Sequence, residues 1–291
     1  MFIATLLTHP DRPILDRAAV ESLRNAWGGG DAVWLNPGVA AEFAIPGVPA
    51  NRWDAWEALQ AMGIDLVVQK AEGRRKRLLI ADMDSTMIEQ ECIDELADEA
   101  GVGAYVASIT ARAMNGELDF DAALTERVGL LKGLPVAVID RVLQHRITLM
   151  SGGPELLATM KAHGAYAALV SGGFTAFTSK IAGLLGFDEN RANTLLTTGD
   201  VLSGAVAMPI LGKAAKLAAL EEIATRLGID PSEAIAVGDG ANDLAMLHRA
   251  GTGVALHAKA IVAAECDCRV NHGDLTALLY IQGYAHAEFA A

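Results

Sequence analysis

Two aspartates, Asp82 and Asp84, stand two residues apart directly after the apolar run 78–81. Whether the chain continues as a strand or turns there, their carboxylates lie close together and resist joint ionisation unless a cation lies between them or one keeps a proton. Asp239 follows another apolar run, 234–237, and supplies a third carboxylate. Three acids that converge on one pocket favour Mg²⁺, which prefers octahedral oxygen ligation.

Other residues suit a phosphoryl group. Ser171 and Gly172 follow a further apolar run, so that a hydroxyl and backbone N–H groups can approach a ligand closely. Lys216, near the start of a helical pattern, supplies a point charge for a phosphoryl oxygen. Asn242 and Asp243 stand at a predicted helix start, where Asp243 also suits a helix cap. Each of these residues alone has an ordinary structural explanation, and only their combination points to phosphoryl chemistry.

The elements that must position these residues alternate between strands and helices. Continuous apolar runs are typical of strands buried on both faces of a parallel sheet, and we predict four of them, at 78–81, 166–170, 234–237 and 252–256. Helical patterns separate these runs, at 155–163, 213–227 and 243–250. The candidate residues follow the strand ends, where an open α/β sheet has its ligand site.

The stretch between the first two of these strands is too long for a plain crossover. Residues 88–150 have the pattern of several amphipathic helices, broken at Gly101, Gly116 and Gly133. We therefore predict a helical cap inserted over the strand ends. Residues 193–206 alternate in polarity about a glycine, which indicates a hairpin.

The first 77 residues differ from the rest of the chain. Their short patterns predict a βαββαβ-like module, with strands at 2–7, 32–35 and 64–69 and helices at 14–27 and 53–62. The basic cluster 74–77 marks a predicted boundary, so we expect a small α/β domain at 1–77 and a larger domain at 78–291. Residues 1–77 carry nine basic and nine acidic side chains and are therefore neutral. Residues 78–291 carry 14 basic and 27 acidic side chains, which accounts for the whole negative charge.

Composition excludes several classes of function. The chain has 291 residues, 52% of them hydrophobic, and a net charge of −13, so an acidic body repels nucleic acid. No run offers the roughly 20 uninterrupted apolar residues of a membrane span, and the N-terminus lacks a basic leader. The three cysteines form no CxxC, and we expect Cys266 and Cys268 to be surface or strand residues rather than metal ligands. We expect a soluble, reduced, cytoplasmic protein.

The order of these motifs resembles the haloacid dehalogenase superfamily of phosphotransferases. The pattern DxDx[TV] corresponds to residues 82–86, the second motif to Ser171, the third to Lys216 and the acidic fourth to GDGAND at 238–243. The resemblance covers residues 78 to about 280 and implies a doubly wound, Rossmann-like parallel sheet with an inserted helical cap. Residues 1–77 are similar in layout to the small amino-acid-binding ACT domains.

Four runs are similar to the branch of that superfamily that hydrolyses O-phospho-L-serine, the last step of serine synthesis: DMDSTMIEQECIDELA, ERVGLLKGLP, SGGF and GDGANDLAML. The resemblance implies that Asp82 is the nucleophile and forms an aspartyl-phosphate. Asp84 is then the general acid for the serine oxygen and later activates water. Mg²⁺ is held by Asp82, the Asp84 backbone carbonyl and Asp239.

The same resemblance assigns the substrate contacts. Ser171, Gly172 and Lys216 hold the phosphoryl group, and Asn242 lines the site. Lys213 competes with Lys216 for this role, and we prefer Lys216 because it lies 23 residues before Asp239, as the family pattern suggests.

Glu91 and Arg127 are assigned to the ammonium and the carboxylate of the serine moiety. A zwitterion requires an anion and a cation placed apart, and arginine can grip a carboxylate through two parallel N–H bonds.

Two other functions remain open from the sequence. One keeps the mechanism and changes the substrate to another small phosphomonoester, such as phosphohomoserine or phosphothreonine. The other is an amino-acid-sensing regulatory protein with an inert phosphatase body, against which the intact Asp82, Asp84, Lys216 and Asp239 argue. The 1–77 module is left with three roles: binding serine, forming a homodimer, or packing on the core.

Overall fold

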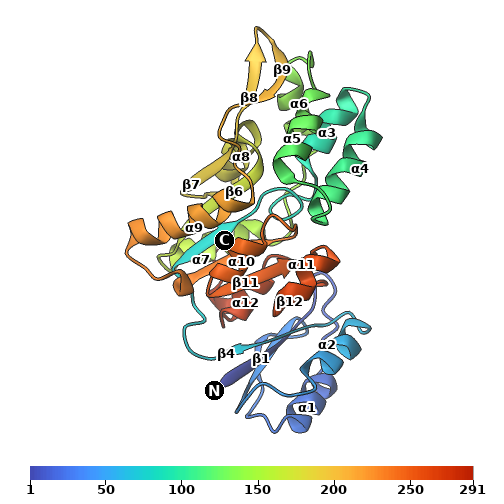
Figure 1. Ribbon diagram of the computed structural model, residues 1–291. Helices are drawn as coiled ribbons and strands as arrows, with labels where there is room; N and C mark the ends of the chain where they lie inside the picture. The colour runs from blue at the N-terminus through green and yellow to red at the C-terminus, as the bar shows by residue number, and fades with distance from the viewer. Residues whose placement is uncertain (291) are drawn as a thin grey trace.

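The computed structural model describes residues 1–290, which form two larger sheets, a two-stranded hairpin and a helical cap above the largest sheet (Figure 1). The larger sheet has six parallel strands in the order β12-β11-β10-β5-β6-β7. Its strands are β5 (Leu78–Ala81), β6 (Tyr166–Phe174), β7 (Glu189–Asn193), β10 (Ala234–Gly238), β11 (Thr252–Leu256) and β12 (Cys268–Val270). The four predicted strands are confirmed, and β7 and β12 are additional.

Helices cover both faces of this sheet. Leu79 and Ala81 of β5 pack into the cluster that contains α7 (Gly153–Ala162), α8 (Thr175–Leu185) and α12 (Ala277–Ile281). The alternate residues Leu78 and Ile80 pack toward α9 (Lys213–Leu227), α10 (Leu244–Arg249) and α11 (Ala260–Glu265). The predicted doubly wound α/β core is therefore confirmed.

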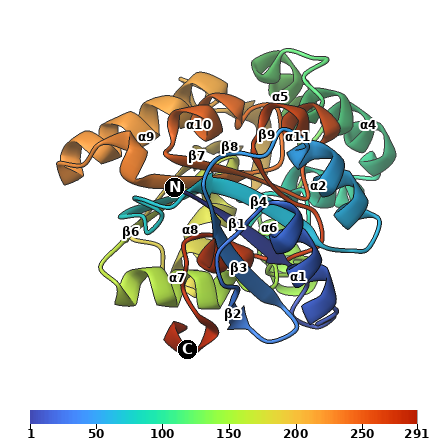
Figure 2. The same cartoon turned by 90° about the horizontal axis from the view of Figure 1, so that it is seen from below.

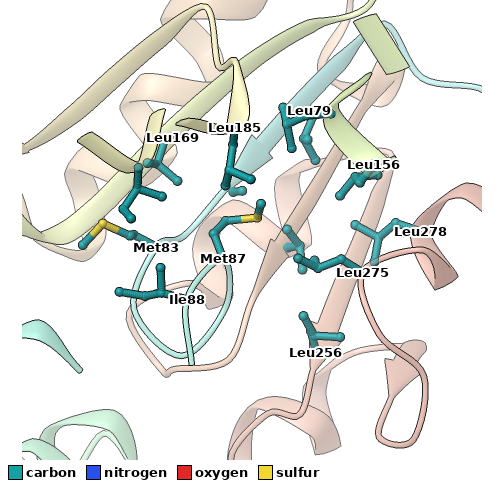
Figure 3. Close-up of a cluster of buried hydrophobic side chains, with 14 of the residues drawn as sticks. Leu79, Met83, Met87, Ile88, Leu156, Leu169, Leu185, Leu256, Leu275 and Leu278 are labelled. Atoms are coloured by element: carbon teal, nitrogen blue, oxygen red, sulfur yellow. The ribbon is translucent and has the colours of Figure 1, made fainter. Parts of the chain in front are cut away.

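Buried methionines fix the loop that leaves β5. Figure 3 shows Met83 and Met87 among the leucines of the first cluster, and both methionines are fully buried. Because Met83 lies between Asp82 and Asp84, its burial anchors the acidic pair at the end of the strand.

The cap consists of four helices, α3 (Cys92–Glu99), α4 (Gly103–Met114), α5 (Phe120–Gly129) and α6 (Ala137–His145). The glycines predicted to break it have φ values of 74°, 74° and 85°, which favour glycine and end or separate the helices. The predicted hairpin is β8 (Leu195–Thr198) and β9 (Val201–Val206), which lies beside the cap in Figure 1. Its backbone bonds to the cap include Gly133 N–H to Leu202 O at 2.9 Å.

The N-terminal sheet is antiparallel, in the order β2-β3-β1-β4, with the βαββαβ layout that the sequence predicts. Its elements are β1 (Phe2–Leu7), α1 (Arg17–Ala26), β2 (Val33–Asn36), β3 (Ala40–Ile45), α2 (Arg52–Gln60) and β4 (Asp65–Lys70). Figure 2, seen from below, shows the strands side by side with α1 and α2 to one side. Leu66 and Val68 pack under these helices, whereas Val67 between them packs toward the core.

Asp65 joins the two sheets. Its fully buried carboxylate accepts backbone N–H bonds from Asn271, His272 and Gly273 at 2.8–2.9 Å, and one from the Gln60 side chain at 3.0 Å. A carboxylate that is buried without a cation is stabilised by such convergent donors.

The remaining elements are the short 3-10 helices η1 (Pro231–Glu233) and η2 (His286–Glu288). The sequence predicted that Cys266 and Cys268 are surface or strand residues. Cys268 does lie in strand β12, but neither cysteine is at the surface, because both are buried. Burial raises the pKa of the Cys266 thiol to about 11. No helix within residues 1–290 is both long and apolar enough to cross a membrane.

Candidate active site

The adjacent strands β5 and β10 bring Asp82 and Asp239 together. Val237 pairs with Ala81, and Asp82 N–H donates to Val237 O at 3.0 Å, so the residues after each strand end as neighbours. Carboxylate oxygens of Asp82, Asp239 and Asp243 lie within 4.8 Å of one another, and all three residues are buried.

This group of acids suits a divalent cation. Asp239 Oδ1 accepts a hydrogen bond from the Thr86 hydroxyl at 3.3 Å, while Oδ2 is buried with no hydrogen-bond partner within residues 1–290. Burial, together with Asp243 and Asp82, raises the pKa of Asp239 well above its ordinary value. Lys259 Nζ lies 3.9 Å from Oδ2, too far for a hydrogen bond. A cation ligated by Oδ2 would compensate both the missing hydrogen bond and the repulsion, so the residues fit the predicted metal.

Lys216 bridges two of these acids. Its ammonium lies 2.7 Å from Asp82 Oδ1 and 2.6 Å from Asp243 Oδ1, and it is fully buried. Lys213, the competing lysine, is exposed at the start of α9. Burial disfavours the Lys216 cation, but Asp243 and Asp82 outweigh burial and raise its pKa.

Asp243 has a role that the sequence analysis missed. Its side chain does not cap α10; Oδ1 holds Lys216, and Oδ2 accepts the Gly240 N–H at 3.1 Å. Burial and the neighbouring Asp82 raise the pKa of Asp243 to about 6, despite the ion pair with Lys216. Its position in the acidic fourth motif could have indicated a role in the site, but the sequence analysis interpreted Asp243 as a helix cap.

Asp84 points away from the three-acid group, toward β6. Oδ1 accepts the Cys92 N–H at 2.8 Å, and Oδ2 accepts the Ser171 hydroxyl at 3.2 Å. Burial and Asp82 raise its pKa, which favours the protonated form that a general acid needs. Its carboxylate is therefore outside the metal group, and the backbone carbonyl assigned to Mg²⁺ stays a prediction.

Strand β6 continues through Ser171 and Gly172 to Phe174, so these residues lie within the strand and not after it as predicted. The change matters little for the site, because the strand brings Ser171 Oγ to Asp84. Glycine is required at 172 by a close approach: a Cβ there would lie 2.5 Å from the Phe120 ring of the cap.

The cap contributes Glu91 and Arg127. Glu91 precedes α3, accepts a hydrogen bond from the Ser85 hydroxyl at 2.7 Å, and has a pKa raised well above its ordinary value by burial and by Asp84. Ser85, to which the sequence analysis gave no direct role, has φ of 53°, a rare backbone conformation for serine. Arg127 is buried on α5, and its Nη1 donates to the Thr110 hydroxyl at 2.9 Å.

One cavity of about 30 Å³ joins most of these groups. The predicted residues that line it are Asp82, Asp84, Glu91, Arg127, Ser171, Gly172 and Asn242. Lys216 and Asp239 do not line it but lie next to Asp82, through the contacts described above. Met114 and Phe120 of the cap also line the cavity, whose volume suits only a few water molecules.

Comparisons with known proteins identify relatives in sequence and in fold. The phosphoserine phosphatase of Archaeoglobus fulgidus is 44% identical over 221 residues, which are 75% of this chain and 64% of that protein. The chain spans just under two thirds of the length of the first three curated relatives that it matches.

Solved structures of haloacid dehalogenase family members have a similar fold. A haloacid dehalogenase family hydrolase from Salmonella enterica is 32% identical, with a TM-score of 0.84 over 96% of this chain and 97% of that one. A structure described as a phospho-aspartyl intermediate analogue of phosphoserine phosphatase is 40% identical, with a TM-score of 0.68 over 71% of this chain and 98% of that one.

The family model of haloacid dehalogenase-like hydrolases matches residues 79–248, more than half of the chain. That span runs from β5 through the cap to α10. It contains every residue that lines the cavity, as well as Lys216, Asp239 and Asp243 beside Asp82. The acidic pair after β5, the lysine-bridged acids after β10 and the inserted cap therefore have a common explanation: this chain belongs to the haloacid dehalogenase-like hydrolases.

Proposed function

We propose that the protein hydrolyses O-phospho-L-serine to L-serine and phosphate. The observation that carries the proposal is the single cavity lined by Asp82 and Asp84 from the core and by Glu91 and Arg127 from the cap. The two core acids suit phosphoryl transfer, and the two cap residues offer opposite charges for a zwitterionic leaving group. The similarity to phosphoserine phosphatases supports this choice of substrate.

In the first step, an oxygen of Asp82 attacks phosphorus and the bond to the serine oxygen breaks, which leaves an aspartyl-phosphate. Asp82 Oδ1 is already held by Lys216 and by the Met83 N–H at 2.8 Å, so Oδ2 is the attacking atom. Asp84 gives its proton to the departing serine oxygen, which suits its raised pKa.

In the second step, the ionised Asp84 takes a proton from water as that water attacks phosphorus. The bond to Asp82 breaks, phosphate leaves, and both carboxyl groups return to their initial states. Ser171 and the Gly172 N–H would hold the phosphoryl oxygens, with Asn242 beside them. Lys216 would balance the charge that collects on Asp82 and the phosphoryl group.

Mg²⁺ would be held by Asp82, Asp239 and the Asp84 backbone carbonyl. When bound, it supplies positive charge that lets a carboxylate approach a phosphomonoester dianion. Asp243 is assigned to Lys216 rather than to the metal, because both of its oxygens already have hydrogen-bond donors.

The domain organisation belongs to the same proposal: an ACT-like domain at 1–77 and the phosphatase domain at 78–291, with the cap at about 88–150. A cytoplasmic location and a homodimer also stay predictions, as does the exclusion of nucleic acid and membrane partners.

The test is phosphate release from O-phospho-L-serine, with Mg²⁺ and with EDTA, beside phosphothreonine, phosphohomoserine and p-nitrophenyl phosphate. We expect a strong preference for phosphoserine that disappears with EDTA. Release from p-nitrophenyl phosphate alone would contradict the substrate and keep the catalytic core. A preference for phosphohomoserine would move the proposal to the longer side chain, and no release from any compound would contradict the function.

A further inference from the structure

Arg127 is a buried arginine without an anionic partner. It is 5% exposed and forms no ion pair within residues 1–290, although Glu91 and Asp94 both act on it electrostatically. Of its five N–H groups, Nε donates to Ala123 O at 3.1 Å and one on Nη1 donates to Thr110 Oγ1 at 2.9 Å. The other three meet no protein acceptor in the described chain, and the side chain lines the active-site cavity.

A chain of hydrogen bonds across three cap helices fixes this guanidinium. Asp94 on α3 accepts the Thr110 hydroxyl at 2.6 Å, and Thr110 on α4 accepts Arg127 Nη1. A hydroxyl has one proton, so donating it to Asp94 turns an oxygen lone pair toward Arg127. Thr110 also lies 3.1 Å from Val106 O on its own helix, which limits the rotation of the hydroxyl.

From this geometry we propose that Thr110 and Asp94 are positioning residues that hold Arg127 toward the carboxylate of the substrate. The inference rests on the proposed function and deepens it, since it names what sets the selectivity of that site for a carboxylate. Thr110 separates Arg127 from the Asp94 carboxylate, and a direct ion pair between these two would occupy the N–H groups that the substrate needs. A preorganised guanidinium also loses less side-chain entropy when it binds.

The decisive comparison uses O-phospho-L-serine and O-phosphoethanolamine, which share the phosphate and the ammonium but differ in the carboxylate. In Thr110→Val, we expect the ratio of kcat/KM for these two substrates to fall on the order of tenfold to a hundredfold, mainly through KM for phosphoserine. Turnover of p-nitrophenyl phosphate should stay near the wild-type value, because the phosphoryl site is untouched. Thr110→Ser keeps the hydroxyl and should restore the ratio.

Thr125 offers a matched control. Its hydroxyl bonds to Asp121 O at 2.7 Å, four residues earlier on α5, in the way that Thr110 contacts Val106 O. Thr125→Val therefore removes a similar helix bond without touching Arg127, and we expect no change in the ratio. Asp94→Ala should lower the ratio less than Thr110→Val, because the hydroxyl still accepts from Arg127 but can then donate only to Val106 O, which turns its lone pairs away from their present direction.

The outcomes separate this inference from the function on which it rests. A wild-type protein that releases no phosphate from phosphoserine would overturn both, whereas one that hydrolyses phosphoserine and phosphoethanolamine equally well would overturn the inference alone. A wild-type preference that persists in Thr110→Val would overturn the inference alone, as would an equal loss on p-nitrophenyl phosphate, which indicates a merely structural role. Where Thr110→Val does not fold, an unchanged ratio in a folded Asp94→Ala would overturn it.

Discussion

At the scale of single residues, the site has more buried acid than buried base. Burial and neighbouring carboxylates raise the pKa of Asp84, Glu91 and Asp239, while Lys216 and Arg127 are the buried cations that face them within the described residues. Such an excess of buried acid is costly, and on the proposed function it would fall when a metal ion and the ammonium of phosphoserine bind. Under this proposal, these acids thus have two cations of different kinds to bind.

Asp82→Asn is expected to abolish turnover, because an amide cannot form the acyl-phosphate. The fold should survive, since the amide oxygen can still accept the Met83 N–H and Lys216 bonds. Phosphate release and thermal unfolding are the measurements. A variant with wild-type activity would remove Asp82 from the nucleophile's role.

Asp84→Asn should lower turnover of phosphoserine by about 10²–10⁴-fold, the usual contribution of a general acid–base group. The amide oxygen can still accept the Cys92 N–H, and the amide NH2 can donate to the Ser171 hydroxyl oxygen in place of the bond that Asp84 accepts, so the side chain keeps its position. We expect a smaller loss with p-nitrophenyl phosphate, whose leaving group departs without a proton. Equal losses for both substrates would place the main contribution of Asp84 in the attack of water, the step that both substrates share, and not in protonation of the leaving group.

The sequence predicted the residues that follow strand ends better than those that support them. Asp82 and Asp239 could be placed together because parallel strands end at the same edge, and this proximity is confirmed. Thr110 gave no signal, since a threonine on an amphipathic helix has no motif and its partners Asp94 and Arg127 come from two other helices.

At the scale of elements, β6 shows where sequence patterns fail. Two adjacent glycines usually end a strand, so the prediction stopped at Val170. The strand instead continues to Phe174, which pairs with Asn193 of β7, and the glycines are explained by the close approach of the cap and Asp84. Strand β7, with the sequence ENRAN, is a polar edge strand without alternation, and β12 has only three residues. Neither has a pattern long enough to detect.

Gly172→Ala tests this contact between β6 and the cap. A Cβ 2.5 Å from the tip of the Phe120 ring forces that ring to shift, and we expect this shift to misplace the cap residues and to lower kcat/KM on the order of 10²-fold. Gly183→Ala on α8 is the control, because a Cβ there meets nothing within 4 Å and helix interiors favour alanine. Full activity in Gly172→Ala would mean that the cap position does not depend on this contact.

At the scale of the whole molecule, Asp65 makes the N-terminal sheet part of the core's stability. Asp65→Ala removes the acceptor of three buried backbone N–H groups, and we expect a loss of about 3 kcal/mol or more in the free energy of unfolding. Asp54→Ala, at an exposed position on α2, should change it by less than about 0.5 kcal/mol. Urea unfolding of both variants measures the difference. Equal free energies of unfolding for the two variants would show that the bonds of Asp65 to residues 271–273 do not stabilise the fold.

Metal binding and pH should be coupled through the buried acids. With the pKa of Asp243 at about 6, the metal-free native state binds more protons than the unfolded chain between the ordinary aspartate pKa and 6. The metal-free protein therefore loses stability as the pH rises through 6, and Asp239 acts in the same direction. We expect Mg²⁺ to raise Tm more at about pH 7.5 than at about pH 5.5, by differential scanning fluorimetry. A larger effect at the lower pH would contradict this assignment of the acids.

The small cavity between cap and core has a practical consequence for crystallography. Because Met114 and Phe120 of the cap line a space of only about 30 Å³, we expect phosphoserine to enter when the cap moves away from β6. A lattice that holds the cap in this position would keep a soaked ligand out of the crystal, whatever its affinity in solution. Ligand complexes should therefore come from co-crystallisation, with the cap free to close around the substrate before the lattice forms.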